Sequence, residues 1–185
     1  MKDLAEQRVN YDEIAPTYDQ RFTSDQSNGV GSALLALARK LSADCILEVG
    51  CGTCHWLTQV QAVSNNLYGL DLSAGMLNQA RSQKTPAQFT RGYARLLPFK
   101  GCFFDFVFCI NAIHHFEESR AFIAEAFRIL KPDGALAIVG NDPHGRKDSW
   151  YVYHYFEGTY ETDLKRFPAW DVVFEWMAAD GFKGL

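Results

Sequence analysis

The chain has 185 residues, of which 48% are hydrophobic and 22% charged, a composition typical of a globular protein that buries one sizeable core. Its net charge of -4 combines 22 acidic and 18 basic residues without a run of lysines or arginines, so the sequence indicates no nucleic-acid partner. No stretch reaches the roughly 18 apolar residues of a membrane span, and no signal segment follows the first lysine. We therefore expect one cytoplasmic domain over 1–185, without a membrane partner and with its five cysteines reduced.

From residue 30 onward, short apolar segments alternate with helical patterns, which predicts an α/β fold with a doubly wound, mainly parallel sheet. The predicted strands are CILEV (45–49), NLYGLD (66–71), AQFTRG (87–92), DFVFCI (105–110) and ALAIVG (135–140). The predicted helices are VGSALLALARKLS (30–42), HWLTQVQAV (55–63), SAGMLNQARSQK (73–84) and SRAFIAEAFRIL (119–130).

Three local features refine these bounds. Ser73 is the expected N-cap of the helix that follows it. Residues 131–134, with the sequence KPDG, are expected to form a turn that ends the preceding helix. In that helix, apolar residues recur at steps of three and four and predict one buried stripe, made of Phe122, Ile123, Ala126, Phe127 and Leu130.

A glycine-rich turn joins the first predicted strand to the next helix. The strand ends at Val49, and Gly50, Cys51, Gly52 and Thr53 follow. This order brings backbone N–H groups and a helix N-terminus to the carboxyl edge of the sheet, as in nucleotide sites. A tight turn without a ligand would give the same pattern, so the two glycines alone leave both interpretations open.

The second predicted strand ends in Asp71, 19 residues beyond Gly52, close to the spacing of about 20 at which an acidic residue accepts hydrogen bonds from ribose hydroxyls. The alternative is an Asp that caps the helix beginning after Ser73. A dinucleotide site is disfavoured because the pattern requires a third glycine where this chain has His55.

Six segments occur in one order: YDEIAPTYDQ, ILEVGCGTC, YGLDLSAGMLNQAR, GYARLLPF, FDFVFCINAIHHF and RILKPDGALAIV. In this order and spacing the chain resembles the class I S-adenosylmethionine-dependent methyltransferases, especially their small-molecule branch, over roughly residues 11–140. The resemblance implies a Rossmann-like methyltransferase fold, S-adenosylmethionine as cofactor and a small-molecule methyl acceptor. It also implies one methyltransferase domain over 1–185.

The resemblance assigns ten residues to the cofactor site. The methionine and ribose end would be lined by Glu48, Gly50 and Gly52, with Asp71 at the ribose hydroxyls. The adenine would lie against Leu72, Tyr93 and Ala94. Further contacts would come from Ile110 and Asn111 after the fourth strand, and from Tyr18 in an N-terminal lid over 1–30.

Two positions depart from the family pattern. Tyr93 stands where the family usually has an acidic residue that contacts the adenine amino group. Cys54 stands in place of a third glycine, and we expect its side chain to crowd the cofactor or shift the loop. Cys51 and Cys54 also form a C-x-x-C pair, but no second pair or histidine spacing accompanies it, so we expect no metal site.

Methyl transfer depends mainly on alignment, and a base is needed only when the acceptor must lose a proton. The candidate bases after strands four and five are His114, His115, Asp142 and His144; packing or capping roles are the alternative for each. The aromatic-rich segment 143–170 is expected to cover the strand ends, either as a wall for a planar or apolar acceptor or as a lid core or dimer contact. Within it, Tyr151, Tyr153 and Tyr155 alternate as in a strand.

Family members normally continue into two further strands, and we expect this sheet to lack them. An open fifth strand would favour a homodimer or a partner segment. Two other functions stay open: a cofactor-binding or regulatory protein without turnover, and, less favoured, an NAD-dependent oxidoreductase.

Overall fold

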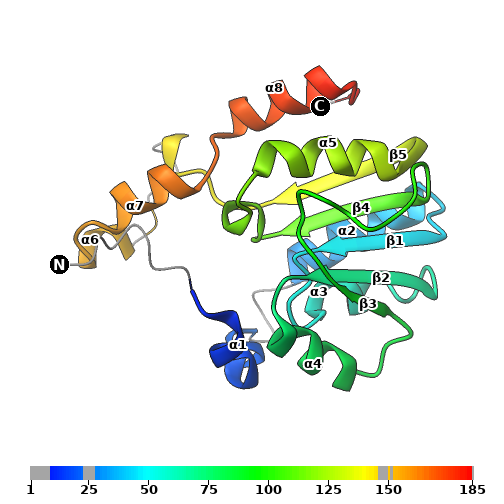
Figure 1. The fold of residues 1–185 in the computed structure, drawn as a ribbon, viewed down its shortest axis with the longest axis horizontal. Helices are drawn as coiled ribbons and strands as arrows, with labels where there is room; N and C mark the ends of the chain where they lie inside the picture. The colour runs from blue at the N-terminus through cyan, green and yellow to red at the C-terminus, as the bar shows by residue number, and fades with distance from the viewer. Residues whose placement is uncertain (1–8, 23–27, 146–149, 151, 185) are drawn as a thin grey trace.

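The computed structural model describes residues 9–22, 28–145, 150 and 152–184, and these form an α/β fold around one five-stranded sheet (Figure 1). All strands are parallel, and their order across the sheet is β3-β2-β1-β4-β5. Their bounds are β1 Cys45–Val49, β2 Asn66–Asp71, β3 Gln88–Arg91, β4 Phe104–Ile110 and β5 Leu130–Val139. The predicted fold class is therefore confirmed.

Helices cover both faces of the sheet. Those with eight or more residues are α2 Asn28–Lys40, α4 Ala74–Ser82, α5 Ser119–Ile129, α7 Thr159–Arg166 and α8 Trp170–Asp180. The shorter helices are α1 Tyr11–Ile14, α3 His55–Gln59 and α6 Val152–Tyr155, with the 3-10 turns η2 Ala15–Arg21, η3 Ile113–His115 and η4 Pro143–Gly145. No helix in the described part of the chain combines the length and apolar character needed to cross a bilayer.

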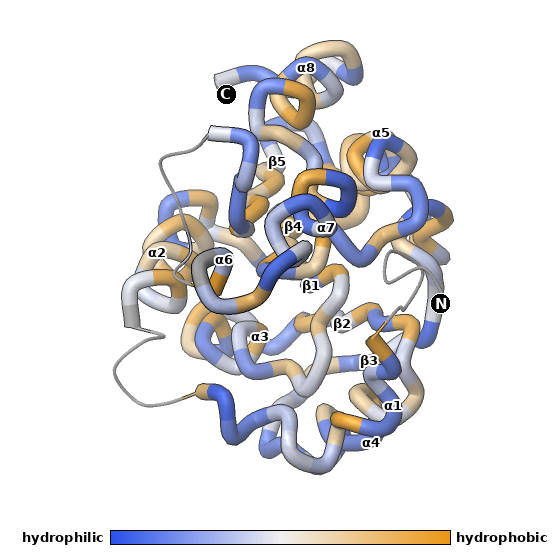
Figure 2. Tube along the Cα trace, turned by 90° about the vertical axis from the view of Figure 1, so that its left-hand side faces the viewer, coloured by the Kyte–Doolittle hydropathy of each residue, from blue (hydrophilic) through white to orange (hydrophobic). Residues whose placement is uncertain are grey.

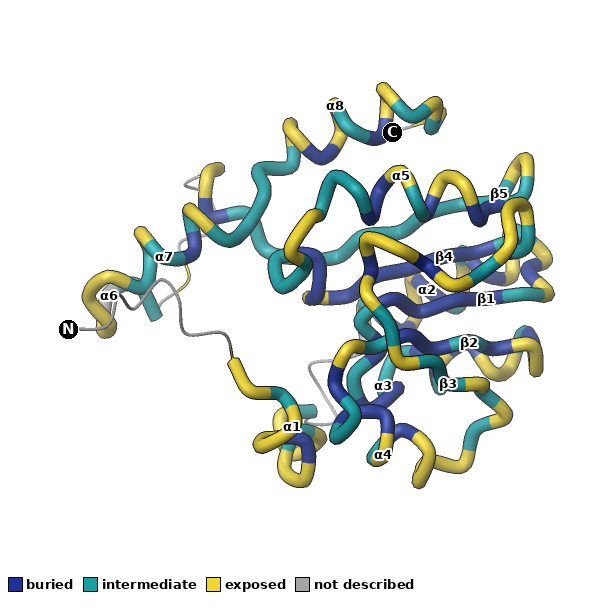
Figure 3. Tube along the Cα trace, viewed as in Figure 1, coloured by how far each residue is buried: buried dark blue, intermediate teal, exposed yellow. Residues whose placement is uncertain are grey.

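Neighbouring strand residues point to opposite faces, and each face has its own core. Ile46 and Phe106 pack with apolar side chains of α2, α3 and α4, whereas Leu47 and Val107 pack with α5 and α8. The inner strands β1 and β4 are mostly buried, whereas the residues of the edge strands β3 and β5 are mostly of intermediate burial or exposed (Figure 3). The helices α2 and α5 show the mixed apolar and polar turns of helices that cover a sheet (Figure 2).

The predicted N-cap and the predicted buried stripe have different outcomes. Ser73 is the N-cap of α4, since its hydroxyl oxygen accepts a hydrogen bond from the Met76 N–H (3.0 Å). The buried stripe is confirmed on α5 at Phe122, Ile123 and Ala126; Leu130 is also buried but begins β5, and Phe127 is 43% exposed. Phe127 instead lies at the edge of the interface with the end of α8, where its ring contacts Phe182 (centroids 5.1 Å apart).

Two segments differ from their predicted structures. Residues 131–134 belong to β5 instead of forming a separate turn, because the extra residues are taken up by a bulge: Phe104 pairs with Leu130, but Phe106 already pairs with Ala135. Tyr153 and Tyr155 lie in the short helix α6, so the strand-like alternation was wrong there, and Tyr151 lies outside the described residues.

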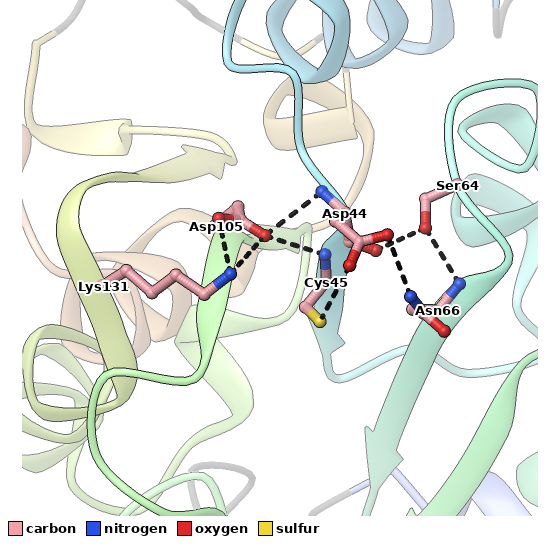
Figure 4. Close-up of polar contacts among 6 residues, drawn as sticks. All are labelled: Asp44, Cys45, Ser64, Asn66, Asp105 and Lys131. Atoms are coloured by element: carbon pink, nitrogen blue, oxygen red, sulfur yellow. Dashed lines mark hydrogen bonds and ion pairs between the residues drawn. The ribbon is translucent and has the colours of Figure 1, made fainter.

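A polar network joins the beginnings of four strands, β1, β2, β4 and β5, at the amino edge of the sheet (Figure 4). Oδ2 of Asp105 accepts hydrogen bonds from the N–H groups of Asp44 (3.1 Å) and Cys45 (2.9 Å), while both oxygens bind Lys131 Nζ (2.8 and 2.9 Å). Asn66 Nδ2 donates to Asp44 Oδ1 (2.9 Å) and extends the network to β2. The network fixes the strand starts and leaves the opposite, carboxyl edge free for a site.

Candidate functional site

A cavity of about 1350 Å³ lies at the carboxyl edge of the sheet, where the loops after β1, β2, β3 and β4 meet. It adjoins a smaller cavity of about 700 Å³, and the two share lining residues in the β1 and β4 loops. The strand order reverses between β1 and β4, which is the point where open α/β sheets bind their ligands. The larger volume exceeds the roughly 300–1,000 Å³ of a single small-molecule pocket, so two ligands can be accommodated.

The turn after β1 requires both of its glycines. Gly50 has a φ of +74°, and a Cβ there would lie 2.5 Å from Ala112 Cβ, far inside van der Waals contact. Its N–H and that of Cys51 both donate to the Leu70 carbonyl (2.8 and 3.0 Å), which holds the turn against β2. Gly52, with a φ of +51°, lies beneath the Tyr18 ring. The turn is thus an open backbone surface at the cavity wall.

Asp71 ends β2 and faces the same cavity. Its Oδ2 accepts a hydrogen bond from the Gly52 N–H (2.8 Å), and its Oδ1 accepts one from the Ser73 N–H (2.9 Å). Burial raises the pKa of this carboxyl, while the backbone N–H groups oppose the shift. Each oxygen keeps a further lone pair, so the capping contact predicted as an alternative coexists with the capacity to accept bonds from a diol.

Glu48 lies deeper, in β1, where only 1% of its surface is exposed. Among the described residues its Oε2 has no hydrogen-bond partner, although the side chain lines the smaller cavity. Burial raises the pKa of this carboxyl well above its usual range, and the charge of Asp71 raises it further. A buried carboxylate oxygen without a partner is costly, and an ammonium group in the cavity would satisfy it.

The wall beyond Asp71 is more apolar and open. Leu72 and Tyr93 are large hydrophobic residues that stay exposed on this wall, and Ala94 lies beside them. The guanidinium of Arg95 stacks over the Tyr93 ring at 4.9 Å. Such a surface suits a planar, weakly polar ring system.

The loop after β4 lines both cavities through Ile110 and Asn111. The Asn111 N–H donates to the Val139 carbonyl (2.7 Å), so its main chain is fixed by β5. With a φ of 50°, Asn111 adopts the left-handed conformation that asparagine tolerates better than most residues. Together with Tyr18, Glu48, Gly50, Gly52, Asp71, Leu72, Tyr93 and Ala94, the structure therefore brings all ten predicted cofactor residues to the two adjoining cavities.

The N-terminal segment lies beside α4 (Figure 1), and Asn10, Tyr11, Asp12 and Tyr18 line the larger cavity. Asp12 Oδ1 accepts hydrogen bonds from the Ser73 hydroxyl (2.6 Å) and the Gly75 N–H (2.7 Å), which lower the pKa of Asp12. A Cβ on Gly75 would lie 2.9 Å from the Asp12 Cα, so this approach depends on glycine. Further along, the Thr53 hydroxyl donates to Asp19.

Of the four candidate bases, the two in η3 lie at the cavities. His115 Nδ1 faces an Arg166 N–H (3.1 Å), and its Nε2 lies 2.6 Å from the Tyr11 hydroxyl. Because a guanidinium only donates, Nδ1 must accept, which leaves the ring proton on Nε2 facing Tyr11. Burial and the charge of Arg166 lower the pKa of His115 to about 4. Burial likewise lowers the pKa of His114 to about 3; its ring stacks on Phe167 (centroids 3.8 Å apart).

The other two candidates lie in the loop after β5 and do not line either cavity. Asp142 accepts hydrogen bonds from the His144 N–H (2.8 Å) and the Trp170 N–H (3.1 Å). His144 is exposed, and its Nε2 lies 2.9 Å from the Phe167 carbonyl oxygen. Both side chains therefore make capping and loop contacts in this structure.

Cys54 does not crowd the cavity, contrary to expectation. Its side chain is fully buried in the core on the α2 and α4 face, with Sγ 3.9 Å from the Ala80 carbonyl oxygen. With a φ of 65°, Cys54 adopts the left-handed conformation that glycine adopts without strain, at a cost in folding free energy on the order of 1 kcal/mol. The left-handed backbone therefore directs the Cys54 side chain into the core, away from both cavities.

Sequence reasoning missed Tyr11, Arg166 and Phe167 as site residues. Tyr11 was within a motif that the sequence singled out, YDEIAPTYDQ, but no role was assigned to it. Arg166 and Phe167, which end α7, had no local signal beyond the aromatic density of segment 143–170. Their contacts with η3 span about 50 residues of sequence, so only the fold shows them.

Comparison with known proteins identifies the family to which this chain is similar. A family model described as a methyltransferase domain matches residues 47–138. A phthiotriol/phenolphthiotriol dimycocerosates methyltransferase of Mycobacterium leprae is 35% identical over 150 residues, covering 77% of this chain and 55% of the relative. A malonyl-[acyl-carrier protein] O-methyltransferase of Pectobacterium atrosepticum is 29% identical over 149 residues, covering 80% and 58%. The chain spans about half the length of these curated relatives.

Among solved structures, a SAM dependent methyltransferase from Aquifex aeolicus has the same fold, with a TM-score of 0.65 and 17% identity, over 92% of this chain and 87% of its own. The matched region 47–138 contains β2, β3 and β4 completely and most of β1 and β5. It therefore includes the strands and loops that carry most of the cavity wall.

Proposed function

Because the chain belongs to the class I S-adenosylmethionine-dependent methyltransferases, we propose that it binds S-adenosylmethionine at the carboxyl edge of its sheet and methylates a small-molecule acceptor. The observation that carries this proposal is the placement of Glu48 and Asp71 along one continuous pair of cavities. One carboxylate has an unsatisfied oxygen and the other has free lone pairs beside a glycine turn. These features fit the ammonium group and the ribose diol of the cofactor.

The remaining cofactor contacts follow from the shape of the wall. Leu72, Tyr93 and Ala94 would hold the adenine, with Tyr93 supplying a ring face where an acidic residue is usual. Tyr18, above Gly52, would close the methionine end. Ile110 and Asn111 would contact the cofactor through a main chain that β5 already fixes.

Bound S-adenosylmethionine supplies an electrophilic methyl group on a positively charged sulfur. The protein's task is then alignment: it holds two molecules in one cavity and excludes water around them. The N-terminal lid (1–30) would do so through residues 10–22, which Asp12 and Asp19 anchor to the core. On the opposite side, the cover (143–170) would contribute Phe167, on which His114 stacks.

The acceptor would occupy the part of the larger cavity between η3 and α7, next to the proposed position of the cofactor. His114 and His115 remain the candidates for proton transfer there, but both are weak bases with lowered pKa values. The Tyr11 hydroxyl is better suited to orient an acceptor, because its oxygen accepts the His115 N–H and its own proton stays free to donate.

The first test is isothermal titration calorimetry with S-adenosylmethionine, S-adenosylhomocysteine and NAD. We expect both sulfur compounds to bind at one site and NAD not to bind. The second test follows S-adenosylhomocysteine release with a panel of small-molecule acceptors. Binding without release across the panel would favour a cofactor-binding protein without turnover, and absence of binding would reject the proposal.

A further inference from the structure

The end of α7 brings two consecutive cations, Lys165 and Arg166, to the acceptor part of the cavity. Neither forms an ion pair with a carboxylate among the described residues. Even Asp163, one turn earlier on the same helix, accepts a hydrogen bond from the Tyr153 hydroxyl (3.1 Å) and makes no ion pair with Arg166. The cavity therefore contains positive charge that its own wall does not neutralise.

Three other cations line the same cavity. Arg91 forms no ion pair among the described residues, and its Nε donates to the Leu72 carbonyl oxygen (2.8 Å). The other two are paired with carboxylates. Arg120 forms a two-pronged ion pair with Asp180 of α8. Arg95 lies 3.6 Å from carboxylate oxygens of both Glu117 and Glu118. Their charges are balanced within the protein, which distinguishes them from the cations of α7.

Arg166 is directed into the site by its contact with His115 Nδ1 (3.1 Å). A cation in the last turn commonly serves only to stabilise the helix dipole, and an exposed residue such as Lys165 can do so. Arg166 instead reaches across the cavity to η3. Since His115 stays neutral, with a pKa of about 4, the contact orients the guanidinium without compensating its charge.

The surroundings of Arg166 combine this charge with flat apolar surfaces. Phe167 and His114 stack nearly parallel, at 13° between their planes, and Phe116 and Trp176 also line the cavity. The carboxylates of Glu48 and Asp71, in contrast, come from β1 and β2, at the expected cofactor end. Glu48 and Asp163 also line the smaller cavity together with Arg166, but among the described residues neither forms an ion pair with it.

We propose that the methyl acceptor is a small molecule with a carboxylate group, which Arg166 binds and Lys165 attracts. This inference rests on the proposed function, because it assigns the acceptor end of the same cavity. The planar guanidinium fork matches a carboxylate, and its N–H groups not used by His115 are free to donate. The apolar surfaces beside it would hold the rest of the molecule. A cationic acceptor would be repelled by the same charge.

The experiment uses matched pairs of probes with the same shape and different charge: benzoate with benzamide, phenylacetate with phenylacetamide, and succinate with succinamide. Each is titrated by calorimetry into the protein saturated with S-adenosylhomocysteine. Variants R166Q and K165Q remove one charge each. The control variant R39Q removes a charge at the end of α2, at the amino edge of the sheet, away from the cavity.

We expect at least one acid to bind about tenfold more tightly than its amide, because a hydrogen bond to a charged group is worth more than a neutral one. R166Q should remove most of this preference, K165Q a smaller part, and R39Q none. S-adenosylhomocysteine affinity and Tm should be unchanged in R166Q, which separates loss of the acceptor site from unfolding.

Three results would overturn the inference: equal binding of acids and amides, no binding of any acid, or an acid preference that survives R166Q. Tighter binding of inorganic phosphate than of every acid would also overturn it, because the anionic group of the acceptor would then be a phosphate and not a carboxylate. If S-adenosylhomocysteine itself fails to bind the wild-type protein, the proposed function fails first, and the two failures are thereby distinguishable.

Discussion

Replacing Glu48 by glutamine should weaken cofactor binding and stabilise the empty protein. The carboxylate is buried in β1, with one oxygen unsatisfied in the described structure. A charge-assisted hydrogen bond to an ammonium group is worth about 1.5–3 kcal/mol, so its loss should weaken S-adenosylmethionine binding about 10- to 150-fold. The amide oxygen of glutamine can still accept the backbone hydrogen bond from Leu57 that the carboxylate accepts.

The stability of the empty protein should change in the opposite direction. Burial raises the pKa of Glu48 above its value in the unfolded chain, so the folded state favours the protonated form. Any stability that this group contributes is present below the unfolded pKa and is lost as the pH rises through the folded pKa. The substitution removes that loss, so the Tm of E48Q should exceed the wild-type Tm by several degrees at pH 8 and by less at pH 5.

Differential scanning calorimetry across pH 5–8 and titration with S-adenosylmethionine measure the two effects. E175Q, on the exposed face of α8, is the matched control and should change neither. If E48Q bound S-adenosylmethionine with wild-type affinity, or if its Tm fell instead of rising at pH 8, Glu48 would not be an unsatisfied carboxylate that binds the ammonium group of the cofactor.

Three further substitutions test the turn, the lid and the amino-edge network. G50A adds a Cβ 2.5 Å from a neighbouring Cβ at positive φ and should cost about 2 kcal/mol or more in urea unfolding, whereas G145A, with open space around it, should be within about 0.5 kcal/mol of wild type. D12A removes the two hydrogen bonds that Asp12 accepts from Ser73 and Gly75, so limited proteolysis within residues 9–22 should accelerate while the core stays resistant; an unchanged cleavage rate would argue against the lid. In Asp105, burial raises the pKa, but the hydrogen bonds from Lys131 and the backbone outweigh burial and lower it. The group therefore contributes stability that is present above the unfolded pKa and is lost as the pH falls through the folded pKa, so D105N should lower Tm at pH 7 and flatten its decline towards acid pH; parallel curves would contradict this.

The sequence predicts which strand-end residues meet at the cavity because their signals are local. Gly50, Gly52 and Asp71 lie at strand ends, where a turn or a cap imposes their residue type, and their spacing follows from one strand-helix-strand unit. Ser73 is predictable for the same reason, since a helix N-cap depends only on the next three residues.

The cluster of Tyr11, His115 and Arg166 is not predictable in this way. The contact between Tyr11 and His115 joins residues 104 positions apart, and the one between His115 and Arg166 spans 51 positions. Both depend on where α1 and α7 pack, which no local pattern encodes. The direction of the Cys54 side chain likewise depends on a left-handed backbone that lets it turn into the core.

The exposure of Phe127 shows the limit of helical periodicity. Its position on α5 fits a buried stripe, but the neighbouring α8 covers only part of that face, so Phe127 stays at the edge of the interface. Periodicity gives the apolar side of a helix, whereas the packing partner decides how much of that side is buried.

The most direct test is a crystal structure of the chain with S-adenosylhomocysteine. The proposed function predicts the amino group against Glu48, the ribose diol against Asp71 and the adenine along Leu72 and Ala94, with empty space left between η3 and α7. A cofactor bound anywhere else, or a saturated protein in which Glu48 and Asp71 make no contact with it, would contradict the assignment of this cavity.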